Sequence, residues 1–486
     1  MSSNVAKVSE LESVLCNDDK TSEGVLHFVT AFTTSRFLRP FDSVKGKGVS
    51  VTQLLVSLIT FRLHGSSIAR MQQPGRSACP AIDDNTFYRL MNNPLMRWRG
   101  LLMGLAKQFA AHVQAKGDGN PSVRCFVLDD TDLEKTGKTI ERVGRIFNHV
   151  TKRYPFGFKL LLLALWDGKS LVSLDFSLHC ERGGTGKQGL TVKEKRAQFS
   201  KVRKAGTPSA QRYTELDQEK HHNAVAMLRR AVKNGVTASY VLMDSWFVND
   251  YTIKAIRAIK GRALHVLGMC KVDNRKYTVD GRAMNAHQLV AKFDRKRAKH
   301  SRKYRTRYIA ITADYKGEKV RLFLMQYNHA SRWTILLTSD LSLSFVQAIE
   351  LYQIRWTIEV LFKECKQYLR LGCSQNTDFD GQVADATLAL VTHTILTLQK
   401  RFGAYETLGD LFRETQQHLL ELTLWERLIT VFLKMVMQLV ELLNVDIEEL
   451  IEKLLQDSQA SRKLLALLSF LRDDWDKCEE TYKSNI

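Results

Sequence analysis

The sequence predicts an α/β protein with a mixed-sheet core, a β-rich insertion and helical regions at both ends. Three observations carry this prediction. Short β-prone runs alternate with helical segments over residues 118–270, and short β segments separated by basic turns fill residues 271–340. Amphipathic helical patterns occupy residues 1–117 and return from residue 341, where a second part of the core (341–395) leads into a C-terminal helical region (396–486).

Composition and charge indicate an intracellular globular protein with a polyanionic partner. The 486 residues contain 44% hydrophobic residues and carry a net charge of +21, which favours nucleic acid as that partner. The first residues lack the apolar core of a signal peptide, and the longest apolar runs, such as Leu160–Trp166, are far shorter than a membrane span. The eight cysteines form no CxxC pair. We therefore expect a cytoplasmic protein with reduced thiols and no membrane contact.

Residues 1–117 are expected to form a helical DNA-binding domain. A short helix over residues 65–73, a turn, and a second helix over Asn85–Met91 suit a helix-turn-helix that exposes Tyr88 and Arg89. Many small helical domains share this pattern, so an ordinary helical domain is the alternative.

Carboxylates follow two predicted strands of the core. The β-prone run at residues 123–128 ends in Asp129 and Asp130, and the run at residues 238–243 ends in Asp244. The carboxyl ends of neighbouring parallel strands meet at one edge of a sheet, where sites of α/β proteins form. We therefore expect these carboxylates to lie together, although each Asp taken alone is more typical of a turn or a helix cap.

One long helix is predicted over residues 351–372, because this stretch has good helix formers, no Pro and no internal Gly. A stripe roughly 60° wide on such a helix carries one carboxylate among cations and a tyrosine: Tyr352, Arg355, Glu359, Lys363 and Lys366. The alternative is a solvated face with intrahelical ion pairs. If the stripe faces the strand ends, Glu359 joins Asp129 and Asp244. Clustered carboxylates need a cation to neutralise them, and hard oxygen ligands suit Mg²⁺ or Mn²⁺.

The order of these elements resembles the ribonuclease H-like catalytic core of DDE transposases, with Asp129, Asp244 and Glu359 at its key positions. The Tyr-x₂-Arg-x₃-Glu-x₆-Lys spacing of residues 352–366 matches the YREK signature of one group of bacterial insertion-sequence transposases. The resemblance covers residues 120–370. It implies that the three acids hold two Mg²⁺ ions, with Mn²⁺ as a substitute, and that the family's Asp-x-Thr/Ser arrangement favours Asp129 over Asp130 as the first ligand.

The resemblance also implies the reaction and its partners. The chain is expected to nick double-stranded DNA at the terminal inverted repeats of its element, to excise the element through hairpins and to transfer its strands into target DNA. A homodimer on paired ends, associated with the nucleoid, is the expected assembly. The acidic, leucine-rich region 396–486 suits self-association, with a helical cap on the core as the alternative.

DNA contacts are expected from three groups of residues. By resemblance, Tyr352, Arg355, Lys363 and Lys366 grip phosphates near the cut, and Trp333 stacks on a flipped base, with a core position as its alternative. Trp246, directly after Ser245, is expected in the core, with support of the site as the alternative. The run 295–307 has eight Lys or Arg in thirteen positions, including Arg295, Lys296, Arg297, Lys299, Arg302 and Lys303. It suits a nucleic-acid contact; a solvated face or a localisation signal is the alternative.

Two other functions fit parts of the pattern. One is a DNA-binding protein with an inactive transposase core, and the other is a ribonuclease H-like nuclease that cuts DNA without strand transfer. The complete set of three acids and four signature residues argues against the first. The basic insertion and the acidic helical tail favour assembly on two DNA ends over simple cutting.

Overall fold

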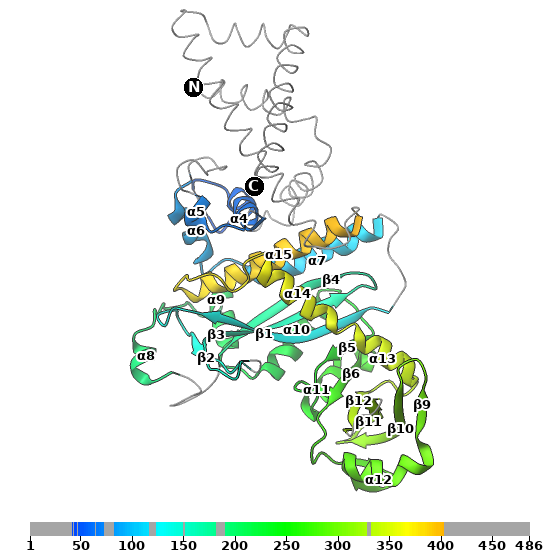
Figure 1. The fold of residues 1–486 in the computed structure, drawn as a ribbon. Helices are drawn as coiled ribbons and strands as arrows, with labels where there is room; N and C mark the ends of the chain where they lie inside the picture. The colour runs from blue at the N-terminus through cyan, green and yellow to red at the C-terminus, as the bar shows by residue number, and fades with distance from the viewer. Residues whose placement is uncertain are drawn as a thin grey trace, which may run out of the picture. The chain divides into compact units, whose positions relative to one another are not determined.

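The described residues form one large mixed sheet with helices packed along it (Figure 1). The computed structural model describes residues 41, 43–45, 47–63, 65–71, 82–115, 123–148, 151–180, 190–327 and 332–402. All of them lie in one compact unit, residues 29–416. The predicted α/β class with a mixed sheet is confirmed. The expected end of the N-terminal domain at residue 117 and the expected helical region after residue 402 lie outside the described residues.

The sheet has twelve strands in the described part of the chain, in the order β2-β3-β1-β5-β6-β12-β11-β10-β7-β8, with β4 paired to β3 and β9 to β10. Their bounds are β1 Cys125–Lys135, β2 Gly144–Arg145, β3 Phe156–Trp166, β4 Leu171–His179, β5 Tyr240–Met243, β6 His265–Cys270, β7 Tyr277–Val279, β8 Arg282–Met284, β9 Lys299–Ser301, β10 Thr306–Tyr315, β11 Glu318–Tyr327 and β12 Thr334–Thr338. Strands β1, β5 and β6 are parallel to one another, and the other pairings are antiparallel.

Helices precede, interrupt and follow the strands. Their bounds are α4 Val51–Leu63, α5 Ile68–Met71, α6 Asp84–Met91, α7 Trp98–Ala115, α8 Val192–Arg196, α9 Pro208–Glu215, α10 Lys220–Lys233, α11 Asp250–Arg257, the 3₁₀ helix η1 Ile259–Arg262, α12 Ala286–Arg297, α13 Phe345–Gln353, α14 Trp356–Gln367 and α15 Phe379–Phe402. In the described part of the chain no helix is long and apolar enough to cross a membrane.

Strand β4 is buried along its whole length. Helices α7, α9, α10, α14 and α15 all contact this strand. Burial of both faces of a strand requires cover on both sides of the sheet, which these helices supply. Helices α7 and α15 also pack against each other and run side by side in Figure 1. They tie the N-terminal helices to the segment that follows α14.

Strand β1 continues past the carboxylates that were expected at its end. It pairs with antiparallel β3 along its whole length, as far as Lys135 opposite Phe156. The predicted end is therefore wrong on this side, because β3 extends the ladder. On the other side, the parallel pairing with β5 stops at Leu128 opposite Met243. Beyond that pair, no described strand pairs with this edge of β1.

The β-rich insertion extends the core sheet. Strand β12 pairs antiparallel with β6, with Ile335 opposite Cys270, and β11, β10, β7 and β8 follow. The insertion thus continues directly from the strand next to β5.

The long helix predicted over residues 351–372 is interrupted. Helix α13 ends at Gln353, and α14 begins at Trp356. The amides of Ile354 and Arg355 between them donate to carbonyls three residues back, as in a 3₁₀ turn. A 3₁₀ turn winds more tightly than an α-helix, so residues on the two sides of the junction do not keep the common stripe of a single helix. The prediction of one helix is therefore wrong, and Arg355 stands at the junction.

Candidate active site

Two carboxylates meet where the parallel pairing of β1 and β5 ends. Leu128 opposite Met243 is the last pair, and the next residues along the two strands are Asp129 and Asp244. Because parallel strands run in the same direction, residues that follow one register pair emerge side by side at the same edge. Asp244 is further fixed by its own turn, since its Oδ1 accepts a hydrogen bond of 3.0 Å from the amide of Trp246.

Helix α14 brings a third carboxylate and a buried arginine to this edge. Arg355 is only 7% exposed. Its guanidinium donates to Asp129 Oδ2 at 2.6 Å and to Glu359 Oε1 at 2.7 Å. Arg355 and Glu359 stand about one helical turn apart, the spacing at which side chains of a helix meet. One guanidinium therefore joins the acid of β1 to the acid of α14.

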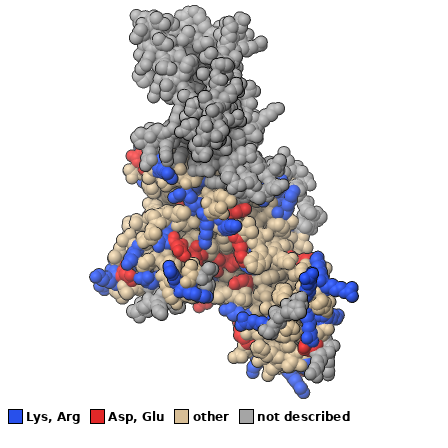
Figure 2. All heavy atoms as spheres, viewed as in Figure 1, with Lys and Arg blue, Asp and Glu red and all other residues tan. Residues whose placement is uncertain are grey.

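An open cleft of about 470 Å³ contains all three predicted acids and three of the four predicted phosphate-gripping residues. It is lined by Asp129, Asp130, Thr131, Asp244, Arg355, Glu359, Phe362, Lys363 and Lys366. Figure 2 shows carboxylates gathered in the middle of the visible face, with Lys and Arg around them. The arrangement places negative charge at the centre of a cationic surround.

The direction of side chains along β1 separates the two adjacent acids. Asp129 contacts Arg355, which directly precedes α14, and Thr131, two residues on, accepts a hydrogen bond of 2.8 Å from Lys366 of α14. Asp130 instead pairs with Lys220 of α10. Alternate residues of a strand point to opposite faces, so Asp129 and Thr131 share the direction toward α14, whereas Asp130, which also lines the cleft, pairs with α10.

The electrostatics of the cleft fit a bound cation. Burial, together with the nearby carboxylates Asp244 and Asp130, raises the pKa of Asp129 to about 7, although the charge of Arg355 opposes this rise. Burial and Asp130 likewise raise the pKa of Asp244. Carboxylates held against mutual repulsion are stabilised by a hard cation such as Mg²⁺. The carboxylates of the cleft are therefore chemically suited to bind a divalent ion.

In geometry, the acids are arranged around Arg355. Among the described residues, no three His, Cys, Asp or Glu side chains form a group that could hold a metal ion. The guanidinium of Arg355 supplies the positive charge between Asp129 and Glu359, and its Nε is buried without a hydrogen-bond partner in the described part of the chain. Closer approach of Glu359 to the two strand acids requires movement of Arg355.

The other predicted contact residues lie in different surroundings. Tyr352 is half-buried at the end of α13, with its ring centroid 5.8 Å from the guanidinium carbon of Arg355, and burial raises its pKa to about 12. Trp333 is half-buried directly before β12. In the basic run, Lys299, Arg302 and Lys303 are exposed, and Lys303 pairs with a carboxylate of α13. The side chains of Arg295, Lys296 and Arg297 lie outside the described part of the chain.

Two residues of the site carried no strong signal in the sequence. Lys220 reaches Asp130 from the start of α10, and only the packing of α10 on the sheet brings the two together. Trp246 was expected in the core but is 41% exposed. The expectation is wrong because the turn after Asp244 directs Phe247 inward and leaves Trp246 at the surface.

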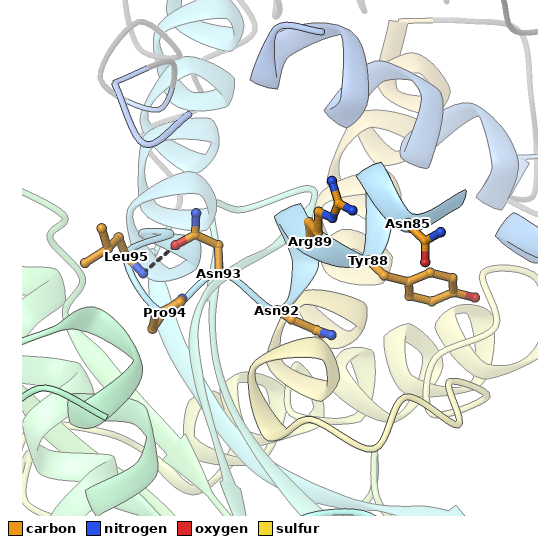
Figure 3. A pocket seen from close by; sticks show the side chains of 7 residues that line it. All are labelled: Asn85, Tyr88, Arg89, Asn92, Asn93, Pro94 and Leu95. Carbon is orange, nitrogen blue, oxygen red and sulfur yellow. Dashed lines mark hydrogen bonds between the residues drawn. The ribbon is translucent and has the colours of Figure 1, made fainter. Parts of the chain in front are cut away.

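The predicted DNA-reading helix is present as α6. Asp83 caps it by accepting a hydrogen bond from the amide of Asn85. A second cavity, of about 580 Å³, is lined by α6 and the segment after it: Asn85, Tyr88, Arg89, Asn92, Asn93, Pro94 and Leu95 (Figure 3). Arg89 is exposed and Tyr88 is half-buried. Residues 72–81, which contain the expected turn, lie outside the described residues.

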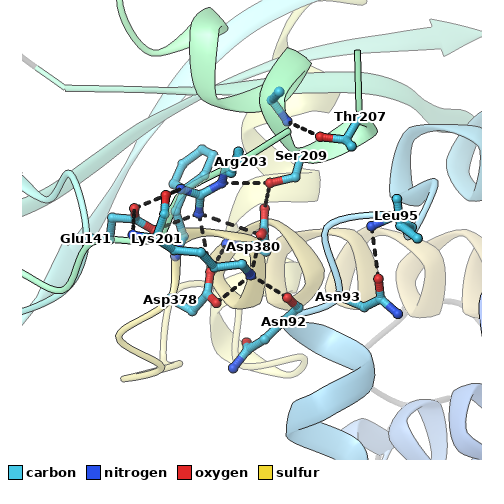
Figure 4. Close-up of polar contacts among 12 residues, drawn as sticks. Asn92, Asn93, Leu95, Glu141, Lys201, Arg203, Thr207, Ser209, Asp378 and Asp380 are labelled. Carbon is cyan, nitrogen blue, oxygen red and sulfur yellow. Dashed lines mark hydrogen bonds and ion pairs between the residues drawn. The ribbon is translucent and has the colours of Figure 1, made fainter. Parts of the chain in front are cut away.

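A buried ion network connects this helical region to the core (Figure 4). Arg203 makes two hydrogen bonds to Glu141, of 2.8 and 2.6 Å. Lys201 donates to Asp378 and Asp380, each at 2.8 Å, and also to the carbonyl of Asn92. The network fixes the start of α15 to the loop after β1 and to the end of α6.

The chain belongs to the DDE superfamily endonuclease family. The family's model matches residues 66–321, more than half of the 486 residues. The match contains Asp129 and Asp244 and ends before Glu359. No curated protein matches the chain. Membership indicates an enzyme of the nuclease or transposase type with DNA as its substrate, in a family that generally uses divalent metals.

Proposed function

We propose that the chain is a DDE transposase of the YREK group that moves its element by cut-and-paste transposition. The steps would be nicking at the terminal inverted repeats, hairpin excision and strand transfer into target DNA. The observation that carries the proposal is the shared cleft, in which Asp129, Asp244 and Glu359 lie beside Lys363 and Lys366. A metal-binding carboxylate set with cations beside it suits a phosphodiester whose charge must be neutralised during attack.

Asp129, Asp244 and Glu359 would hold two Mg²⁺ ions, with Mn²⁺ as a substitute. When bound, such ions stabilise the attacking and leaving oxygens of an in-line phosphoryl displacement. Before binding, Arg355 neutralises Asp129 and Glu359. Release of these carboxylates would leave its guanidinium free to contact a phosphate, because Arg binds a carboxylate and a phosphate with the same bidentate geometry.

The residues around the cleft would position the DNA backbone. Lys363 and Lys366 are exposed at its rim, where ammonium groups contact phosphates without reading sequence. Tyr352 would complete this contact set, and Trp333 would stack on a base. The run 295–307 would follow the backbone over the insertion, and α6 would read the terminal repeats.

The proposed assembly is a homodimer on paired DNA ends, associated with the nucleoid. Residues 1–117 would bind DNA, residues 118–270 and 341–395 would form the catalytic core, and residues 271–340 would be the insertion. Self-association would use residues 396–486. The net charge of +21 suits a protein held on DNA.

Strand transfer distinguishes the transposase from a nuclease of the same family. The purified chain is incubated with Mg²⁺, a labelled duplex that ends in the repeat flanking its gene, and a supercoiled target plasmid. Joining of the labelled 3′ end to the plasmid is the expected result. Cutting without joined product would replace the proposal with the nuclease, and binding without cutting would replace it with the inactive DNA-binding protein.

A further inference from the structure

Trp246 presents a large aromatic ring to solvent directly beside the cleft. It is 41% exposed, although it comes two residues after the cleft acid Asp244. Its amide donates to that carboxylate at 3.0 Å. A single exposed apolar side chain is common at a protein surface, so the contacts that hold this ring decide whether it can serve a ligand.

The ring of Trp246 is held rigidly. It stacks on the ring of His221, with centroids 4.3 Å apart and planes 6° apart. His221 is itself fixed by contacts of 3.1 Å with Asn249 and 3.3 Å with Thr252. Phe247 packs edge-on against both rings. An aromatic surface that is already ordered loses little side-chain entropy when a flat ligand stacks on it.

A cation links this aromatic pair to the acids. The ammonium of Lys220 lies 4.6 Å from the centroid of the Trp246 ring and also pairs with Asp130. An ammonium over an indole is a cation–π contact, and it sets a positive charge directly against the exposed ring. A ligand that combines a flat ring with negative charge matches both features.

We propose that Trp246, supported by His221 and Lys220, stacks on an unpaired DNA base next to the phosphate held in the cleft. This inference rests on the proposed function, because it takes the cleft as the place where the DNA backbone is cut. Base stacking on an aromatic side chain is tolerant of sequence, so the subsite would hold the strand near the cut without reading it. The adjacent Lys220 would contact the phosphate of the same nucleotide.

Charge and position indicate that a DNA base, and not a protein segment, stacks on Trp246. Lys363 and Lys366 line the cleft, and the chain carries a net charge of +21. A second exposed ring, Tyr251 at 40%, lies on α11 beside His222, with ring centroids 4.5 Å apart. Aromatic rings interleaved with cations are typical of surfaces that bind single-stranded nucleic acid.

The test compares two labelled duplexes of the same sequence, one blunt and one ending in a single-stranded oligothymidine tail. Binding to the full-length chain is measured by fluorescence anisotropy in Ca²⁺, which limits cleavage. Trp246→Ala is expected to weaken binding of the tailed duplex by about 5- to 150-fold and to leave the blunt duplex unchanged. Trp246→Phe should retain most of the affinity. Phe199→Ala removes another 41% exposed ring, outside the cleft lining, and should bind both duplexes normally.

An abasic scan of the tail then identifies the stacked base. At one tail position, removal of the base should weaken binding by the unmodified chain as much as Trp246→Ala weakens binding of the intact tail. The same removal should not weaken binding by Trp246→Ala any further. Normal binding by Trp246→Ala, equal loss on both duplexes, or losses that add at every position would each overturn the proposal. The outcome does not depend on cleavage. If the chain fails to transfer strands but shows this pattern of binding losses, only the proposed function is refuted.

Discussion

The guanidinium of Arg355 lies 2.6 Å from the carboxylate of Asp129, so the first acid of the cleft is neutralised by a residue 226 positions later in the chain. The contact joins the edge of the sheet to the junction between α13 and α14. It also stands where the proposed reaction needs metal ions.

Replacement of Arg355 by Ala removes the cation between two carboxylates. We expect it to lower the free energy of unfolding without divalent metal by about 3–5 kcal/mol at pH 8, above the pKa of Asp129, because breaking a buried ion pair leaves charge uncompensated. Added Mg²⁺ or Mn²⁺ should then raise the melting temperature of the variant more than that of the unmodified chain. Equal shifts would show that Arg355 and the ion do not compete for these acids.

The raised pKa of Asp129 sets the sign of a pH dependence of stability. Its pKa is about 7 in the folded chain and 3.8 in its ordinary state, so the folded state holds the proton more tightly. Stability from this group is complete below about pH 4 and is lost as the pH rises toward 7. The melting temperature of Asp129→Asn minus that of the unmodified chain should therefore be higher at pH 8 than at pH 4. Thermal melts in EDTA measure this, and a pH-independent difference would contradict it.

The ion network around Glu141 should show the opposite dependence. Burial alone would raise the pKa of Glu141, but hydrogen bonds from Arg203 and from the amides of Phe379 and Lys201 hold it below its ordinary value of 4.5. Its contribution is present above about pH 4.5 and is lost as the pH falls through the lower folded pKa. Glu141→Gln should cost about 3 kcal/mol near neutral pH and less in acid.

A matched control for Glu141 is Asp217→Asn, which removes a carboxylate from an ion pair with Arg142. The Asp217 side chain is 60% exposed. Exposed pairs contribute about 0–1 kcal/mol, so this variant should change little. Denaturant unfolding at two pH values compares the variants. Equal losses from both would mean that the network has no special role.

The close packing of Gly268 on β6 helps to position the cleft acid Asp244. It pairs with Met243, the last residue of β5 before Asp244. A Cβ at Gly268 would lie 2.5 Å from Val248 Cγ2 and 2.8 Å from the Met243 carbonyl oxygen. Gly268→Ala should therefore cost about 1–3 kcal/mol in stability and lower DNA nicking by displacing Asp244.

The comparison for this variant is Gly100→Ala in α7. There an added Cβ would meet its nearest neighbour at 3.8 Å, an ordinary contact. This change should be neutral or stabilising, since Ala favours a helix over Gly. Normal stability and nicking by Gly268→Ala would show that the strand edge tolerates the shift.

The sequence predicted the meeting of Asp129 and Asp244 because it depends on local signals. Each acid follows a short β-prone run, and the carboxyl ends of neighbouring parallel strands lie at the same edge of a sheet. The continuation of β1 could not be seen, because it depends on β3, a partner in a different segment. The junction at Arg355 was also hidden, since its residues have good helix propensity and the tighter turn is set by packing.

Contacts between distant segments were beyond local patterns. Arg355 was expected to grip phosphate, and nothing in the spacing showed that it would first bind Asp129. The pairing of Lys201 with Asp378 joins residues 177 positions apart. The exposure of Trp246 depends on which of two adjacent aromatic rings turns inward, and composition does not determine that choice.

The proposed role of Glu359 is tested most directly by Glu359→Gln. The measurement is Mg²⁺-dependent nicking of a duplex that carries the terminal repeat, with affinity for the same duplex measured alongside. Glu364→Gln is the control, because Glu364 lies on the same helix, bonds to His393 at 2.9 Å and does not line the cleft. We predict that Glu359→Gln binds the duplex normally but nicks it at a rate reduced by about 100-fold or more. Glu364→Gln should nick at the normal rate. Nicking by Glu359→Gln at the unmodified rate would contradict the assignment of Glu359 to the reaction.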